Sequence, residues 1–153
     1  MKKGASHRNH KRLLLVEDDE LFSQALVDYL SPRYSVQPVP NADRAWELLS
    51  QEIPELILLD ITLPGTDGIS MLKALKERLA QVPVIMLTAM DRIQTVVECM
   101  KQGAADYLTK PIISEELLAS VERALESVEM KRELDQRREL QLVTNPAGRS
   151  PGP

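Results

Sequence analysis

Cysteine and histidine are scarce in this chain of 153 residues. The single cysteine, Cys99, cannot form an intrachain disulfide, and one thiolate excludes a zinc-ribbon cluster. The two histidines, His7 and His10, lie near the start of the chain, so neither is placed for acid–base catalysis within a domain. We therefore expect a protein of the reducing cytoplasm.

Long apolar runs are also missing. The first one, Leu13–Val16, is too short for the core of a signal peptide, and nothing approaches the roughly 20 residues of a membrane-spanning helix. The net charge of −4 gives no sign of general nucleic-acid binding. The one basic segment is the start of the chain, and we expect residues 1–10 to form a flexible, solubilising arm. No glycine-rich loop follows the first run, which excludes a P-loop and a dinucleotide fingerprint.

Short apolar runs alternate with amphipathic segments along the rest of the chain. Continuous apolar runs are typical of parallel strands that are covered on both faces, whereas Pro38 in the second run favours an edge strand. The alternation predicts a doubly wound α/β domain over residues 11–128. The five expected strands cover residues 12–16, 34–39, 56–60, 82–88 and 106–109.

Helical periodicity predicts five helices between and after these strands. The last helix continues in polar form over residues 129–142, and the proline- and glycine-containing end, 143–153, is expected to be disordered. The apolar stripe of the first helix is expected at Leu21, Ala25, Leu26, Tyr29 and Leu30, and that of the fourth at Ile93, Val96, Val97 and Met100.

Polar residues follow the expected strands at their carboxyl ends, where open α/β sheets bind ligands. Glu17, Asp18 and Asp19 follow the first strand, and the third strand ends in Asp60. If the strands are neighbours, these acids converge with groups from the other strand ends. Clustered carboxylates suit Mg²⁺, and a central carboxylate can attack a phosphoryl group to form an acyl phosphate.

Two further strand ends complete this chemistry. Thr88 ends the fourth strand, and its hydroxyl could hydrogen-bond a phosphoryl oxygen. Lys110 follows the fifth strand and, with the metal, would offset the charge on the transferred group.

Four motifs in this order, LLVEDD, LILLDITLPGTDG, PVIMLTA and GAADYLTKP, resemble the receiver domain of two-component response regulators. The resemblance covers residues 11–128 and implies a flavodoxin-like, five-stranded parallel sheet of order 2-1-3-4-5. The segment from the third motif onward is similar to receivers that precede a central ATPase domain in transcription activators.

The resemblance also implies a role for each matching residue. Asp60 corresponds to the phosphoacceptor and Lys110 to the lysine of the site. Mg²⁺ would be held by Asp18, Asp60, Glu17 and the main-chain carbonyl of Thr62, with Asp18 the direct ligand of the acidic pair. Thr88 and Tyr107 correspond to the switch residues, and the Lys110–Pro111 peptide bond to one that is cis in this family.

As a signalling domain, such a chain catalyses only its own phosphorylation and dephosphorylation. Its implied partners are a sensor histidine kinase or phosphotransfer protein, a downstream output domain or protein, and a second copy in a phosphorylation-dependent homodimer. It would act in transcription regulation without binding nucleic acid or membrane itself. For the dimer of winged-helix regulators, Asp106 fits the charged pattern, whereas Ser120 replaces an expected arginine.

Other interpretations stay open at this point. The polar helix resembles a linker, so the chain is either cut from a longer regulator or a complete single-domain regulator. A haloacid-dehalogenase-like phosphatase also uses an aspartate nucleophile with Mg²⁺. That family carries an Asp-x-Asp motif, whereas here Ile61 and Thr62 follow Asp60, so the second acid is missing. A pseudo-receiver acting only as an interaction module is a third hypothesis, which the complete acidic set argues against.

Overall fold

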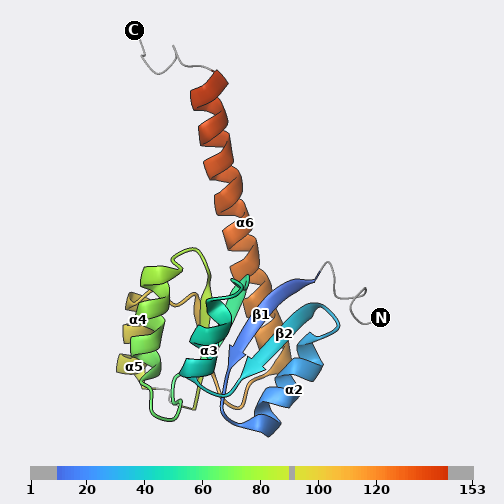
Figure 1. Ribbon diagram of the computed structural model, residues 1–153, viewed down its shortest axis with the longest axis vertical. Coiled ribbons are helices and arrows are strands. Elements are labelled where there is room, and N and C mark those ends of the chain that lie inside the picture. Colours follow the sequence, from blue (N-terminus) through green and yellow to red (C-terminus); the bar gives the residue numbers. More distant parts are fainter. Residues whose placement is uncertain (1–9, 90–91, 145–153) are drawn as a thin grey trace.

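The computed structural model describes residues 10–89 and 92–144, and the strands of this part form one parallel sheet (Figure 1). The sheet order is β2-β1-β3-β4-β5, and every neighbouring pair is parallel. The predicted doubly wound sheet and the edge position of the Pro38 strand are therefore confirmed. The strands are β1 (Lys11–Val16), β2 (Tyr34–Val39), β3 (Leu56–Asp60), β4 (Val84–Thr88) and β5 (Asp106–Thr109).

Helices cover both faces of the sheet (Figure 1). One face packs against α2 and α6, and the other against α3, α4 and α5. This layering explains the continuous apolar runs, because successive strand residues point to opposite faces and both faces are buried. The helices are α2 (Glu20–Leu30), α3 (Ala42–Leu49), α4 (Gly68–Arg78), α5 (Ile93–Lys101) and α6 (Ser114–Thr144).

Three helices begin at side-chain caps that also shape the carboxyl edge of the sheet. Asp19, Asn41 and Asp67 have extended backbone, and each side-chain oxygen accepts a hydrogen bond from an amide in the first turn of α2, α3 or α4. Gly68 follows the third cap in close contact with Ile61, where a Cβ would lie 2.5 Å from the Ile61 Cα.

The expected apolar stripe of α2 is confirmed at Leu26 and Leu30 and wrong at Leu21, Ala25 and Tyr29, which are exposed. Leu21 is 86% exposed, and the buried positions of α2 are Ser23, Leu26 and Leu30. The spacing of apolar residues predicted that Leu21 and Tyr29 face the core, but the small Ser23 is buried there instead. The sequence pattern could not reveal this, because serine carries no apolar signal.

The expected stripe of α5 was also wrong. Ile93 is 77% exposed, and Val97 and Met100 also lie at the surface. Cys99 is the buried residue of this helix, and burial raises the pKa of its thiol. The apolar face of α5 is therefore mostly a surface feature.

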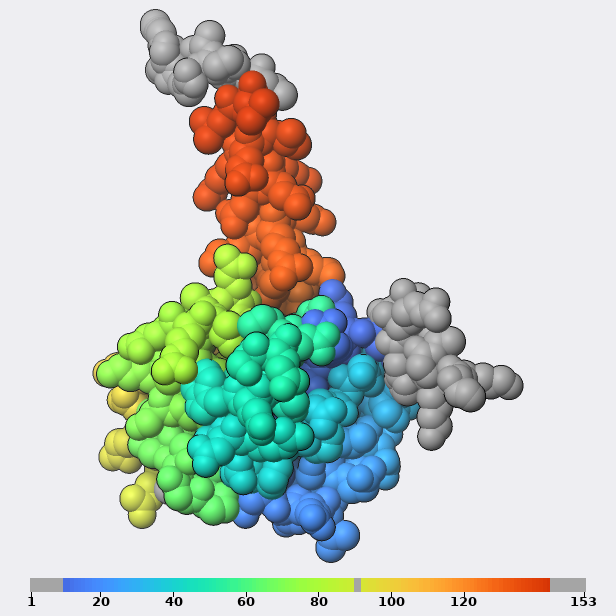
Figure 2. All heavy atoms as spheres, viewed as in Figure 1, coloured from blue at the N-terminus to red at the C-terminus, as the bar shows by residue number. Residues whose placement is uncertain are grey.

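The last helix continues well past the body of the domain (Figures 1 and 2). All side chains from 129 to 143 are exposed, and α6 runs to Thr144, two residues beyond the predicted end. An ion pair of 2.8 Å between Lys11 and Glu129 joins β1 to the start of this extension. The limits 11–128 of the domain stay a prediction, and most of the predicted arm and tail lies outside the described residues. No helix in the described part has the length and apolarity needed to cross a bilayer.

The orientation of α2 can be tested with a matched pair of substitutions. Leu26→Ala should lower the free energy of unfolding by about 2 to 5 kcal/mol, because it leaves a cavity in the core. Leu21→Ala should change it by less than about 0.5 kcal/mol, since that side chain is exposed. Urea unfolding measures both, and equal losses would contradict the orientation of this helix.

Candidate functional site

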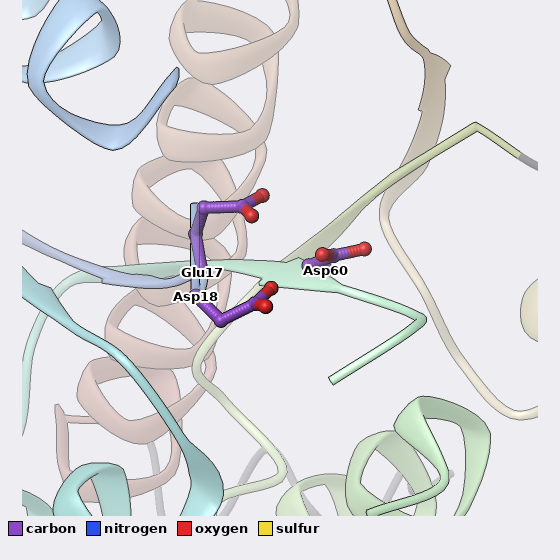
Figure 3. Close-up of side chains that lie close together, drawn as sticks. All are labelled: Glu17, Asp18 and Asp60. Carbon is purple, nitrogen blue, oxygen red and sulfur yellow. The ribbon is translucent and has the colours of Figure 1, made fainter. Parts of the chain in front are cut away.

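Three carboxylates meet where β1 and β3 end (Figure 3). These strands are neighbours, with Val16 paired to Leu59, so the residues that follow β1 lie beside Asp60. Ligand oxygens of Glu17, Asp18 and Asp60 all lie within 4.8 Å of one another. Asp60 and Glu17 are buried and Asp18 is exposed, so the cluster opens to water on the Asp18 side.

The three successive acids after β1 have different contacts. The Glu17 carboxylate accepts hydrogen bonds from the Asp19 amide at 3.0 Å and from the Lys110 ammonium at 2.8 Å. Asp19 is the cap of α2, where its side chain accepts from the Phe22 amide at 3.1 Å. Asp18 lies between Glu17 and Asp19 in the sequence, and its carboxylate points toward Asp60 (Figure 3). The acidic run is thus divided between ion pairing, helix capping and the open cluster.

Asp60 is held differently at its two oxygens. Oδ1 accepts hydrogen bonds from the amide and the hydroxyl of Thr62, each at 3.1 Å. Oδ2 lies 3.5 Å from the Lys110 ammonium. These contacts fix the carboxylate plane of a side chain that is only 2% exposed.

Lys110 reaches the cluster from the end of β5. Its amide donates to the Thr88 carbonyl at 2.7 Å, and the Lys110–Pro111 bond is cis. The ammonium lies 4.3 Å from the centroid of the Phe22 ring, within the range of a cation–π contact. Phe22 was not among the site residues expected from the sequence.

Thr88 and Tyr107 lie on adjacent strands. Thr88 is fully buried at the end of β4 and pairs with Thr109 of β5. Tyr107 is two residues before Thr109, so its side chain and that of Thr88 point to the same face of the sheet. Tyr107 is half-buried and packs against the core beneath α3, α4 and α5.

Burial and pairing shift the protonation of two groups in the site. Burial raises the pKa of Glu17, and the nearby charge of Asp60 adds to this, although the Lys110 hydrogen bond opposes it. Burial would lower the pKa of Lys110, but its hydrogen bond to Glu17 and the charges of Asp60 and Glu17 outweigh that effect and raise it. Without a cation, ionising Glu17 is therefore costly in the folded protein.

The cluster suits a hard divalent cation. It offers three carboxylates against one ammonium, so negative charge is in excess. Oxygen ligands with an open, hydrated side are what Mg²⁺ prefers in proteins. The donor types, their spacing and the exposure of Asp18 all fit this ion.

The pKa of Glu17 predicts a trend of stability with pH. A carboxyl group whose pKa is raised on folding stabilises the protein while protonated and loses that contribution as it ionises. The free energy of unfolding of the metal-free wild type should therefore fall relative to that of Glu17→Gln as the pH rises from about 4.5 through the raised pKa. Saturating Mg²⁺ should suppress this trend, because a metal binds the carboxylate form. Urea unfolding measures both free energies, and a difference between wild type and Glu17→Gln that does not change with pH would contradict the prediction.

Comparisons with known proteins agree with this geometry. A family model, the response regulator receiver domain, matches residues 13–122. Transcriptional regulatory protein BaeR of Escherichia coli O6:H1 is 35% identical over 130 residues, which are 84% of this chain and 53% of that protein. Nitrogen assimilation regulatory protein NtrX of Azorhizobium caulinodans is 35% identical over 137 residues, covering 88% of this chain and 30% of that protein.

A solved structure gives the same result. The response regulator receiver domain protein of Methanospirillum hungatei JF-1 is 26% identical with a TM-score of 0.76, and the match covers 80% of this chain and 99% of that one. The chain thus spans about half the length of BaeR and less of NtrX. It is a signalling domain rather than a classical enzyme. The chain belongs to the response regulator receiver domain family of two-component systems.

Proposed function

We propose that this chain is a phosphorylation-controlled switch that accepts a phosphoryl group on Asp60 in a Mg²⁺-dependent reaction. The observation that supports it most is the placement of Asp60, whose Oδ2 faces Lys110 while Oδ1 is held by Thr62. A buried, oriented carboxylate beside a cation site is suited to nucleophilic attack on phosphorus. The product is an aspartyl phosphate, formed as the donor's leaving group departs.

The residues around Asp60 would supply the electrostatic part of the reaction. Asp18, Glu17, Asp60 and the Thr62 carbonyl would hold Mg²⁺, which when bound offsets negative charge on the phosphoryl oxygens. Lys110 would turn from its pair with Glu17 toward the transferred group, because a phosphoryl group brings more negative charge than it replaces. The Thr88 hydroxyl would donate to a phosphoryl oxygen.

The switch would use Thr88 and Tyr107. Movement of Thr88 toward the phosphoryl group would vacate space on the face of the sheet that both side chains share. The Tyr107 ring could then move inward, changing the surface formed by α5, β5 and α6. This is a population shift, so both arrangements must exist before phosphorylation.

The partners would follow from the family. In the cytoplasm, a sensor histidine kinase or phosphotransfer protein would donate the phosphoryl group to this chain, and an output domain or protein of a transcription regulator would respond to it. A phosphorylation-dependent homodimer is also proposed. Asp106, however, already accepts a hydrogen bond of 2.6 Å from Ser120 and lies 3.3 Å from Arg123, so its charge is engaged within the chain. This contact disfavours a dimer built on Asp106 in the manner of winged-helix regulators.

The acceptor can be identified by intact mass after incubation with Mg²⁺ and acetyl phosphate. Wild type should gain one labile phosphoryl group, and Asp60→Asn should gain none, because an amide is a poor nucleophile. Asp67→Asn removes the same charge from the exposed cap of α4 and should still be phosphorylated. An adduct at wild-type level in Asp60→Asn would move the acceptor elsewhere, with Asp18 the next candidate. No adduct in wild type would favour a pure interaction module.

Coupling through Thr88 can be measured by chemical shifts with beryllofluoride as the phosphoryl mimic. In wild type the mimic should shift signals around residues 17–19 and 60–66 and also along 92–109. In Thr88→Ala the first two groups should still shift, whereas the shifts near Tyr107 should shrink. Thr109→Ala, which truncates the exposed partner of Thr88 on β5, is the control and should respond like wild type. Shifts confined to the first two groups in wild type would refute the switch.

A further inference from the structure

We propose that Phe22 is a positioning residue for Lys110, and that its ring keeps the ammonium inside the acidic cluster. The consequence for phosphoryl transfer depends on the function proposed above. The contact itself does not, because it involves only these two side chains.

Three groups surround the Lys110 ammonium. It lies 2.8 Å from Glu17, 3.5 Å from Asp60 and 4.3 Å from the centroid of the Phe22 ring. The Lys110 side chain is 22% exposed, so the ammonium that faces the ring is partly desolvated. An ammonium over an aromatic face is attracted by the ring quadrupole, and more strongly when it is partly desolvated.

The ring is itself fixed from two directions. On one side, the Asp19 cap accepts from the Phe22 amide, and the Asp19 amide donates to Glu17, so the backbone that carries the ring is tied to the same carboxylate that pairs with Lys110. On the other side, the half-buried ring packs against the core between the sheet, α2 and α6. Phe22 is thus held rigidly, whereas Lys110 has a long flexible side chain.

This difference in flexibility gives the contact its effect. A lysine side chain loses much rotamer freedom when its ammonium is confined, and water competes for that ammonium. A fixed ring that attracts the ammonium raises the fraction of time for which the ammonium stays beside Glu17 and Asp60. Weakening the ring's quadrupole should therefore slow phosphoryl transfer roughly two- to fivefold.

The chain permits an unusually direct test, because Phe22 is its only phenylalanine. Growth of a phenylalanine auxotroph on fluorinated analogues would place one, two or three fluorines on this ring alone. Fluorination lowers the ring's attraction for a cation while nearly preserving its shape. The phosphorylation rate with acetyl phosphate should fall stepwise through the series, and exchange of the Lys110 ammonium protons with water should become faster. A core role alone would leave both quantities unchanged.

Substitutions give a second test that does not need the analogues. Phe22→Tyr keeps an aromatic face and should retain the ring-current shift of the Lys110 ε-methylene protons, whereas Phe22→Leu should lose it and phosphorylate more slowly. Leu21→Ala, in the same turn but exposed, should match wild type in both measurements. A ring-current shift in wild type with equal rates across the fluorinated series would overturn the positioning role. Absence of the shift in wild type would overturn the contact, whatever the outcome for Asp60.

Discussion

The structure of this receiver is organised around the repulsion among Glu17, Asp18 and Asp60. Carboxylates this close, two of them buried, are unfavourable without a counter-charge, and the Lys110 ammonium supplies a single positive charge. The remaining excess makes the site responsive, because a bound cation or a phosphoryl group changes which contacts are most favourable. Lys110 is the element free to respond, since its pair with Glu17 and its longer contact with Asp60 compete.

The fold holds these charges in place by ordinary packing. Apolar residues buried on both faces hold β1, β3 and β4, and β5 pairs with β4, so these four strands bring their terminal residues to one edge of the sheet. Different side chains connect the site to the two faces of the sheet. Thr88 and Tyr107 point to the face covered by α3, α4 and α5, whereas Phe22 connects Lys110 to the core under α2 and α6. A change at Asp60 therefore has two physical routes into the domain.

The sequence was sufficient to predict features that depend on continuous apolar runs and on the residues at strand ends. The sheet, the edge strand with Pro38 and the convergence of Asp60 with Lys110 all followed from those patterns or from the family motifs. It failed for parts of the inward faces of α2 and α5, because the small Ser23 and Cys99 fill close-packed positions outside the stripes of large apolar residues. It also missed Phe22, because a contact between residues so far apart in the chain depends on how α2 packs against the sheet and where the segment after β5 places Lys110. The Asp19 cap three residues earlier was the local signal that could have indicated this placement.

The central claim, that the acidic cluster is a cation site relieved of its repulsion by Mg²⁺, is tested most directly by urea unfolding across a Mg²⁺ titration. Wild type should gain stability as RT ln(1 + [Mg²⁺]/Kd), which is about 2.7 kcal/mol at a concentration 100 times Kd. Asp18→Asn should lose most of this gain, whereas Asp19→Asn, which removes the neighbouring charge but keeps a capping side chain, should retain it. Wild-type unfolding curves that are the same with and without Mg²⁺, or equal gains in both variants, would contradict the account.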